Sequence, residues 1–291
     1  SWSSGHITSL AGWSQCITSN PPYPFFQVPF PCHYLKETNM STKKVFVTGA
    51  NKGIGLATVE ELLETEPDTY VFLGSRDYQR GVDAMKSIVA KTPAFESRLE
   101  VVEIDVCSKD SIAKAAAAVE AKHGKPCLYA LINNAGIAHG SVKACADVNF
   151  HGVHDVCEAF LPLVIKPNGK ICILGSAAGP MFVEKCKPDK QAILTNPKVT
   201  LHELTEVLTH NLSDSAEEIG YPTGGFHTYG LSKALVMAYT MYLQEQHPTL
   251  VINSVTPGYI DTDLTKQFRG DKSAEEAGMK SVKQGAQAVL H

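Results

Sequence analysis

The sequence predicts an α/β fold built on one doubly wound parallel sheet. Short apolar strand candidates alternate with helix-length segments, the first strand leads directly into a glycine-rich turn and a helix, and polar residues follow the ends of successive strands. Alternation of this kind implies right-handed crossovers and a parallel sheet covered by helices on both faces. The sequence shows no internal repeat and no second domain, so we expect a single domain.

The expected elements follow one another from Lys43 onward. The strand candidates are residues 45–48, 70–73, 99–104, 128–132, 170–174 and 251–255. The helix candidates are residues 55–64, 81–89, 111–122, 151–164, 200–219 and 229–245, and a helix-like stretch covers 273–290. Apolar residues at helical spacing support the helix at 200–219.

Residues 1–39 differ in composition from the rest of the chain. No Lys, Arg, Asp or Glu precedes Lys36, and Pro, Ser and aromatic residues dominate. The segment lacks the basic and continuous apolar regions of a signal peptide and the arginines of a mitochondrial transit peptide. Met40 lies just before the first strand candidate and suits a natural start. We expect residues 1–39 to be a non-native or disordered extension and residues 40–291 to form the domain.

The composition favours an ordinary soluble protein. The 291 residues are 44% hydrophobic and 19% charged with a net charge of −4, which gives no reason to expect binding to nucleic acid or to an anionic membrane. No apolar run reaches the roughly 18 residues of a membrane span. The eight cysteines are scattered without Cys-x-x-Cys or zinc-like spacing, which favours reduced thiols in the cytoplasm. His151 and His154 lack a supporting ligand pattern, so we expect no metal site.

The glycine-rich turn indicates a Rossmann-type nucleotide site. Gly49, Gly53 and Gly55 lie between the first strand and its helix, where glycines let the backbone turn tightly and approach a pyrophosphate at the helix N-terminus. Their spacing, Gly-x-x-x-Gly-x-Gly, differs from the usual Gly-x-Gly-x-x-Gly. The competing interpretation is a glycine-rich turn that binds no ligand.

The end of the second strand favours NADP(H) over NAD(H). An NAD site usually places an acidic residue there to bind the ribose 2′-hydroxyl, whereas this chain has Ser75 followed by Arg76. Lys52 adds a second cation within the glycine turn. Two cations without the acid suit a 2′-phosphate. Alternatively, both are solvated surface charges.

Four polar residues predict a reactive centre. Tyr229 and Lys233 are four residues apart and therefore share one helix face, where a cation favours the ionised form of a phenol whose pKa is ordinarily ~10. Ser176 follows the fifth strand and Asn149 lies in the helix before it. Ligands of such sheets bind at the carboxyl ends of the strands, so the set in this order is informative although each member alone is weak.

On these residues the chain resembles the classical branch of the short-chain dehydrogenase/reductase family over about residues 43–290, and within it the carbonyl reductases. The resemblance rests on Thr48, the three glycines, Asp105, Asn133–Gly136, Asn149, Ser176, Tyr229, Lys233 and Pro257–Gly258. It implies a catalytic set of Asn149, Ser176, Tyr229 and Lys233. The implied cofactor contacts are Gly49, Asn51, Lys52, Gly53, Ile54, Gly55, Arg76, Asp105, Val106, Asn133, Ala135, Gly136, Tyr229, Lys233, Pro257, Gly258, Ile260 and Thr262.

The implied reaction is NADPH-dependent reduction of a small-molecule aldehyde, ketone or quinone to an alcohol. Tyr229 would act as general acid, Lys233 would lower its pKa and bind the nicotinamide ribose, and Ser176 would bind the substrate oxygen. By resemblance, Asn149 would hold a water for proton resupply. Tyr259, with Phe226, suggests an apolar substrate pocket, although Tyr259 could equally pack against the sheet. An oxidative alcohol or steroid dehydrogenase and a non-catalytic NADP(H) sensor remain the alternatives.

Two features concern the frame around this site. Tyr229 follows Ser176 by 53 positions (229 − 176), against about a dozen in most members, which marks a helical insertion at about residues 181–226. In the carbonyl reductases the comparable insertion covers the oligomerisation face, which implies a monomer; a plain surface excursion is the other interpretation. The family's seventh strand has no counterpart here, so we expect an unpaired sixth strand and a missing last strand, as in a fragment or truncated gene product.

Overall fold

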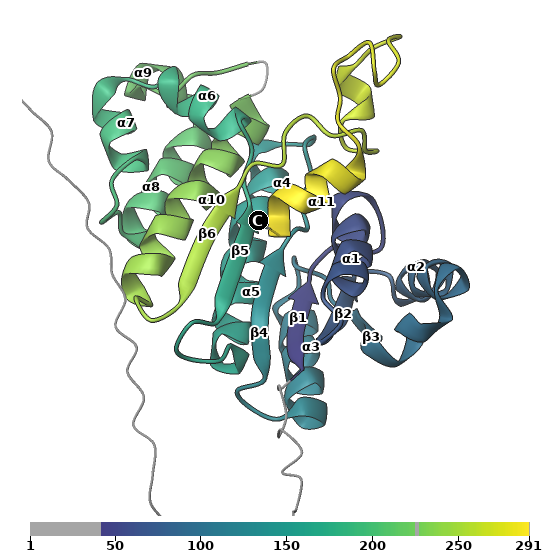
Figure 1. The fold of residues 1–291 in the computed structure, drawn as a ribbon. Helices are drawn as coiled ribbons and strands as arrows, with labels where there is room; N and C mark the ends of the chain where they lie inside the picture. Colours follow the sequence, from purple (N-terminus) through teal and green to yellow (C-terminus); the bar gives the residue numbers. More distant parts are fainter. Residues whose placement is uncertain (1–41, 225–226, 291) are drawn as a thin grey trace, which may run out of the picture. The chain divides into compact units, whose positions relative to one another are not determined.

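Six parallel strands form the sheet in the computed structural model of the chain. They are β1 (Lys43–Val47), β2 (Thr69–Ser75), β3 (Leu99–Glu103), β4 (Leu128–Asn133), β5 (Lys170–Leu174) and β6 (Val251–Val255), arranged in the order β3-β2-β1-β4-β5-β6 (Figure 1). The direction of winding reverses between β1 and β4, which is the point where sheets of this kind bind ligands. The structure describes residues 42–224 and 227–290, so the expectations for residues 1–39 and for Phe226 lie outside it.

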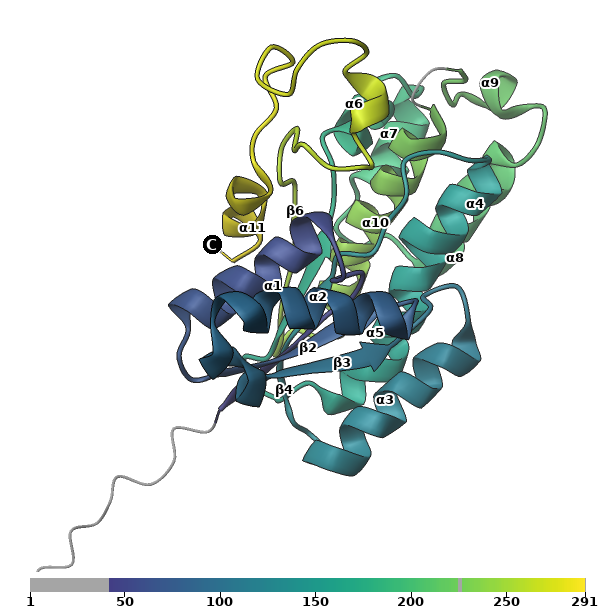
Figure 2. The ribbon, with the colours of Figure 1, turned by 90° about the vertical axis from the view of Figure 1, so that its right-hand side faces the viewer.

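Helices cover both faces of the sheet. One face carries α1 (Gly53–Thr65), α2 (Tyr78–Lys91) and α11 (Val282–Leu290), and the other carries α3 (Lys109–His123), α5 (Gly152–Phe160) and α10 (His227–Gln246). In Figure 2, α11 lies beside α1. Successive side chains of a strand point to opposite faces. Accordingly Val45 and Val47 of β1 join the core under α1 and α2, while Phe46 joins the larger core under α3, α5 and α10. Burial on both faces explains why the strands are apolar at consecutive positions.

The predicted fold is confirmed, with three corrections to helices. The helix expected at residues 151–164 ends at Phe160, because Pro162 cannot continue it, and it begins after a π-helical turn, Asp147–His151. The helix expected at 200–219 is two helices, Leu201–Asn211 and Ala216–Ile219, and between them the Ser213 hydroxyl donates to the carbonyl of His210 at 2.7 Å. In the stretch 273–290 only Val282–Leu290 is α-helical, and Gly278 interrupts the remainder with a φ of +67°.

The insertion before Tyr229 is more helical than the sequence predicted. It contains α6 (Ala178–Glu184), α7 (Pro188–Leu194), α8 (Leu201–Asn211) and α9 (Ala216–Ile219). Helices α6, α7 and α8 pack against α10. Leu204, Val207 and Leu208 of α8 are buried in the same core as Tyr239 of α10. A capping box between Thr200 and Glu203 fixes where α8 begins. The insertion is therefore a packed layer over α10.

In the described residues, β6 is an edge strand that pairs with β5 alone. Beyond β6 the chain forms a single parallel bridge between Ile260 and Lys280, and α11 then returns to pack on α1. A short helix, α4 (Val142–Ala146), leads into the π-helical turn. None of the described helices combines the length and apolar character that crossing a lipid bilayer requires.

Candidate active site

The glycine turn after β1 is fixed to the end of β4 by Thr48 and Asn134. The Thr48 hydroxyl accepts from the backbone N–H groups of Asn134 and Ala135, each at 3.1 Å. In return, the Asn134 amide donates to the carbonyls of Thr48 at 2.8 Å and Gly49 at 3.0 Å. A Cβ on Gly49 would lie 2.9 Å from the Ala135 backbone, which is closer than atoms can approach. The Asn133–Gly136 segment thus forms one wall of the turn.

The turn has the properties of a dinucleotide cradle. Gly49 and Gly53 have φ of +63° and +59°, which favour glycine, and a Cβ on Gly55 would lie 2.7 Å from the Gly49 carbonyl oxygen. Lys52 is the N-cap of α1 but offers no side-chain cap, so the first N–H groups of this 13-residue helix are available to a ligand. Such N–H groups bind the pyrophosphate of a nicotinamide cofactor. The residues therefore fit that group.

Near the expected 2′-phosphate position, the Asp77 carboxylate accepts a hydrogen bond within the protein, whereas the Arg76 side chain has no such partner among the described residues. The Asp77 carboxylate caps α2 by accepting from the Arg80 N–H at 3.0 Å, and the buried Ser75 hydroxyl donates to the Asp77 carbonyl. Arg76 is exposed and forms no hydrogen bond or ion pair with any described residue. Lys52, also exposed, pairs with Asp263 at 3.0 Å, and Lys266 pairs with the same carboxylate at 3.2 Å. These pairs lower the pKa of Asp263.

The other residues expected to bind the cofactor border the same turn or follow β3 and β6. A Cβ on Gly53 would lie 3.6 Å from the Thr262 methyl group, so the loop after β6 reaches over the turn. Ile260 and Ile54 both contact the Gly285 position of α11. Gly258, after Pro257, has a φ of +98°. Asp105, which precedes Val106, accepts from the Cys107 N–H at 3.0 Å, so its carboxylate is held at the end of β3.

Lys233 is a buried cation at the end of β5. Its side chain is in a residue only 5% exposed, and its ammonium donates to the carbonyl of Leu174 at 2.6 Å. Burial lowers the pKa of Lys233 to about 8. The ammonium lies 5.9 Å from the centroid of the Tyr229 ring, so the two residues share one face of α10.

Tyr229 is partly buried and interacts with Ser176. Burial raises the pKa of Tyr229 above its usual value, and a hydrogen bond with the Ser176 side chain acts in the opposite direction. The expectation that the pKa of Tyr229 is lowered is therefore wrong for this structure, because desolvation of the phenolate is the largest effect. A raised pKa keeps the phenol protonated at neutral pH, the form that can donate a proton.

Asn149 ties α10 to the loop that follows β4. It is fully buried in the π-helical turn, where its amide donates to the Ile137 carbonyl at 2.8 Å and the Ser232 hydroxyl at 2.9 Å. Its carbonyl oxygen accepts from the Ile137 N–H at 2.9 Å. A Cβ on Gly136 would lie 3.1 Å from this oxygen and 3.7 Å from the Lys233 ammonium, so glycine leaves the gap between the two groups open.

A pocket of about 550 Å³ is lined by two of the expected catalytic residues, Ser176 and Tyr229. Ser176, Tyr229 and Tyr259 all line it, so Tyr259 faces the pocket and is 37% exposed. Most of the other wall comes from α6 and from the loop after β6, including Met181, Phe182 and Phe268. The pocket is thus largely apolar with hydroxyls at one place in its wall, which is the usual character of a small-molecule site.

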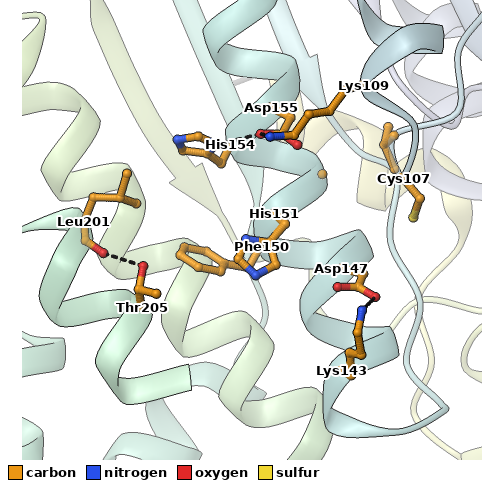
Figure 3. Close-up of a pocket in the computed structure, with 12 residues that line it drawn as sticks. Cys107, Lys109, Lys143, Asp147, Phe150, His151, His154, Asp155, Leu201 and Thr205 are labelled. Atoms are coloured by element: carbon orange, nitrogen blue, oxygen red, sulfur yellow. Dashed lines mark hydrogen bonds and ion pairs between the residues drawn. The ribbon is translucent and has the colours of Figure 1, made fainter. Parts of the chain in front are cut away.

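A second cavity, of about 510 Å³, lies between α5 and α8, and Figure 3 shows its lining. Its lysines are engaged: Lys143 pairs with Asp147 at 2.6 Å and Lys109 with Asp155 at 3.7 Å. His154 contacts Asp155, and among the described residues no group of three or more His, Cys, Asp or Glu side chains could hold a metal ion. None of the four expected catalytic residues lines this cavity, whereas Ser176 and Tyr229 line the first pocket.

The fold and this arrangement of glycine turn, serine, tyrosine and lysine define a nicotinamide-dependent oxidoreductase. The model of the short chain dehydrogenase family matches residues 43–216, more than half of the chain. The chain belongs to the short-chain dehydrogenase/reductase family, whose members bind nicotinamide cofactors, and among its relatives are carbonyl reductases.

Two curated relatives and one solved structure show how similar this chain is to individual proteins. Carbonyl reductase [NADPH] 1 of Sus scrofa is 30% identical over 242 residues, covering 77% of this chain and 80% of the relative. (+)-Neomenthol dehydrogenase of Capsicum annuum is 28% identical over 279 residues, covering 79% and 87%. The solved structure of salutaridine reductase from Papaver somniferum superposes with a TM-score of 0.72 at 23% identity, covering 85% of this chain and 94% of that one. That similarity confirms the fold.

Some residues that shape the site were not predicted from the sequence. Asn134 lies inside the Asn-Asn-Ala-Gly segment and Ser232 lies directly before Lys233, so their positions beside expected site residues were the available signal. Asp263 follows Thr262 directly, so its position beside an expected cofactor contact was the available signal. Leu174 acts through its backbone carbonyl, for which no side-chain pattern exists.

Proposed function

We propose that the protein is an NADPH-dependent carbonyl reductase that converts aldehydes, ketones or quinones to alcohols. The observation that carries this proposal is the common pocket of Ser176 and Tyr229, next to the buried Lys233 and beside the glycine turn. The relative from Sus scrofa bears the name of an NADPH carbonyl reductase, which supports the same activity here. The bound cofactor would supply the hydride.

The residues of this chain would position the substrate and move the proton. Ser176 would donate a hydrogen bond to the carbonyl oxygen and stabilise the negative charge that develops on it. Tyr229 would donate its proton to the same oxygen as general acid, since its phenol is protonated at neutral pH and lines the same pocket as Ser176. Lys233 would bind the nicotinamide ribose. The open gap at Gly136 suits a water between Asn149 and Lys233 that resupplies the proton.

The activity is tested by NADPH oxidation with the full chain and a panel of aldehydes, ketones and quinones. We expect turnover of apolar carbonyl compounds, because the pocket wall is mostly apolar. Tight NADPH binding without turnover of any compound would contradict this function and favour the sensor. Turnover of alcohols with NADP⁺ alone would favour an oxidative dehydrogenase.

NADPH should be preferred over NADH because Arg76 and Lys52 border the 2′-phosphate position. Arg76→Gln should lower kcat/KM for NADPH about tenfold, since it removes a charge-assisted hydrogen bond at an exposed position. The value for NADH should stay within about twofold, because NADH has no 2′-phosphate. Steady-state kinetics with both cofactors measures this, and equal kcat/KM for NADPH and NADH in the unmodified protein would rule out the proposed preference.

Asp263→Asn should change the affinity for NADPH in the opposite direction to Arg76→Gln. It releases Lys52 from its ion pair and should tighten NADPH binding about two- to threefold, the scale of an exposed pair, without affecting NADH. Asp261→Asn is the matched control, because Asp261 pairs with Arg269 at 3.2 Å and does not pair with Lys52. The readout is the dissociation constant of each cofactor from fluorescence titration.

We also propose that the protein is cytoplasmic and monomeric. The packing of α7 and α8 over α10 supports the second statement, because these helices occupy the outer side of α10. Sedimentation equilibrium of the full chain gives its mass, and a stable dimer would contradict the proposal.

A further inference from the structure

The catalytic pocket has one lysine in its wall that the proposed reaction does not use. Lys185 follows α6 directly and lines the pocket together with the apolar side chains of Met181, Phe182, Tyr259, Leu264 and Phe268. Its side chain is exposed and forms no ion pair or hydrogen bond with any described residue. The other lysines of the insertion near it are engaged: Lys187 donates to the Glu218 carbonyl and Lys190 pairs with Asp189.

The described residues of the pocket wall include a positively charged side chain and no negatively charged one. None of the described residues that line the pocket is Asp or Glu. The pocket also contains His227, whose ring nitrogen lies 2.9 Å from the Asn211 side-chain oxygen, and whose pKa is lowered by burial, so it is neutral at pH 7. The charge in the described lining of the pocket is therefore the Lys185 ammonium, against a largely apolar surface.

We propose, on the basis of the proposed carbonyl reductase activity, that the substrate class is apolar carbonyl compounds that also carry a carboxylate, which Lys185 binds. An ammonium at the rim of an apolar, carboxylate-free pocket attracts an anion and forms a charge-assisted hydrogen bond with it. A neutral substrate would gain nothing from this group. Lys185 is thus a specificity-determining residue for the same pocket that holds the catalytic side chains.

We expect the length of α6, which lies between Ser176 and Lys185, to determine which substrate length fits best. Ser176 lies just before α6 and Lys185 just after it, so the backbones of the two residues are separated by about the length of this seven-residue helix. At 1.5 Å per residue that length is on the order of 10 Å. A long-chain keto acid such as 8-oxo-8-phenyloctanoate can reach from one end to the other. A short one, 4-oxo-4-phenylbutanoate, spans less of this separation.

The test compares 8-oxo-8-phenyloctanoate with its primary amide, which has the same length and no charge. In the unmodified protein kcat/KM should be about five- to tenfold higher for the acid at low salt, an effect between those of exposed and desolvated charged pairs. The advantage of the acid over the amide should fall at high ionic strength and be smaller for 4-oxo-4-phenylbutanoate than for the long acid. Lys185→Gln should remove the advantage of the acid and leave kcat/KM for the amide within about twofold of the value for the unmodified protein. Lys198→Gln, at an exposed lysine of the insertion outside the pocket wall, should change neither value.

Two results would overturn the proposal while leaving the reductase activity intact. One is that Lys185→Gln lowers kcat/KM equally for the acid and the amide, and the other is that the unmodified protein shows no preference for the acid. Equilibrium dialysis of the acid and the amide gives a readout that needs no turnover. There too, Lys185→Gln should weaken binding of the acid alone. Absence of NADPH oxidation with every compound would contradict the reductase function, and the dialysis result would then still decide the role of Lys185.

Discussion

Replacing Tyr229 by phenylalanine is expected to lower kcat for carbonyl reduction by about 10³-fold, the scale of losing a positioned general acid. The change removes the hydroxyl that interacts with Ser176 and keeps the ring that lies 5.9 Å from the Lys233 ammonium. Cofactor affinity should stay within about threefold, because the glycine turn, the end of β4 and Lys233 are unchanged. Stopped-flow reduction under single-turnover conditions and fluorescence titration with NADPH measure the two quantities separately.

Tyr259→Phe is the matched control for this change. Tyr259 lines the same pocket, so the same loss of one phenolic hydroxyl should alter substrate KM more than kcat. If Tyr229→Phe retains turnover near that of the unmodified protein, Tyr229 is not the acid. If Tyr259→Phe loses as much kcat as Tyr229→Phe, the loss reflects general damage to the pocket.

The strand pattern of the sequence was sufficient to predict the sheet, because burial on both faces makes each strand apolar at consecutive positions. The expected strands at 170–174 and 251–255 coincide with β5 and β6. Helix ends were predicted less well. Local features decide where a helix stops, such as Pro162 just after Phe160, and hydrophobic periodicity does not report them.

The expected catalytic residues were found by residue type and order, and the structure adds how they are held. Spacing alone placed Tyr229 and Lys233 on one helix face. It could not reveal that the ammonium donates to the Leu174 carbonyl, or that burial raises the pKa of Tyr229. Both depend on how α10 packs against β5, which brings together residues far apart in the sequence. The pocket wall formed by α6 depends on tertiary packing in the same way.

Lys233→Met should abolish most carbonyl reduction and, in addition, change how stability depends on pH. In the folded protein burial lowers the pKa of Lys233 to about 8, whereas an unfolded lysine titrates at its ordinary 10.5. Below pH 8 both states are protonated, and the buried charge costs folding about 3 kcal/mol at 1.36 kcal/mol per pKa unit. Between about pH 8 and 10.5 the unfolded state binds more protons, so the stability of the unmodified protein rises with pH across this window.

The methionine variant lacks this titration, so its free energy of unfolding should not show that rise. The difference in free energy of unfolding between the two proteins at pH 7 alone is less informative. Lys233→Met also leaves the Leu174 carbonyl without its donor, and the cost of about 1–3 kcal/mol offsets the gain from removing the buried charge. The difference between the two proteins as a function of pH is therefore the quantity to measure, by urea unfolding at pH 7, 8, 9 and 10. Lys198→Met, at an exposed lysine, should give a curve parallel to that of the unmodified protein. Parallel curves for Lys233→Met would mean that the ammonium is not desolvated. A diverging curve with lost activity would show that the cation is retained for function although it destabilises the fold at neutral pH.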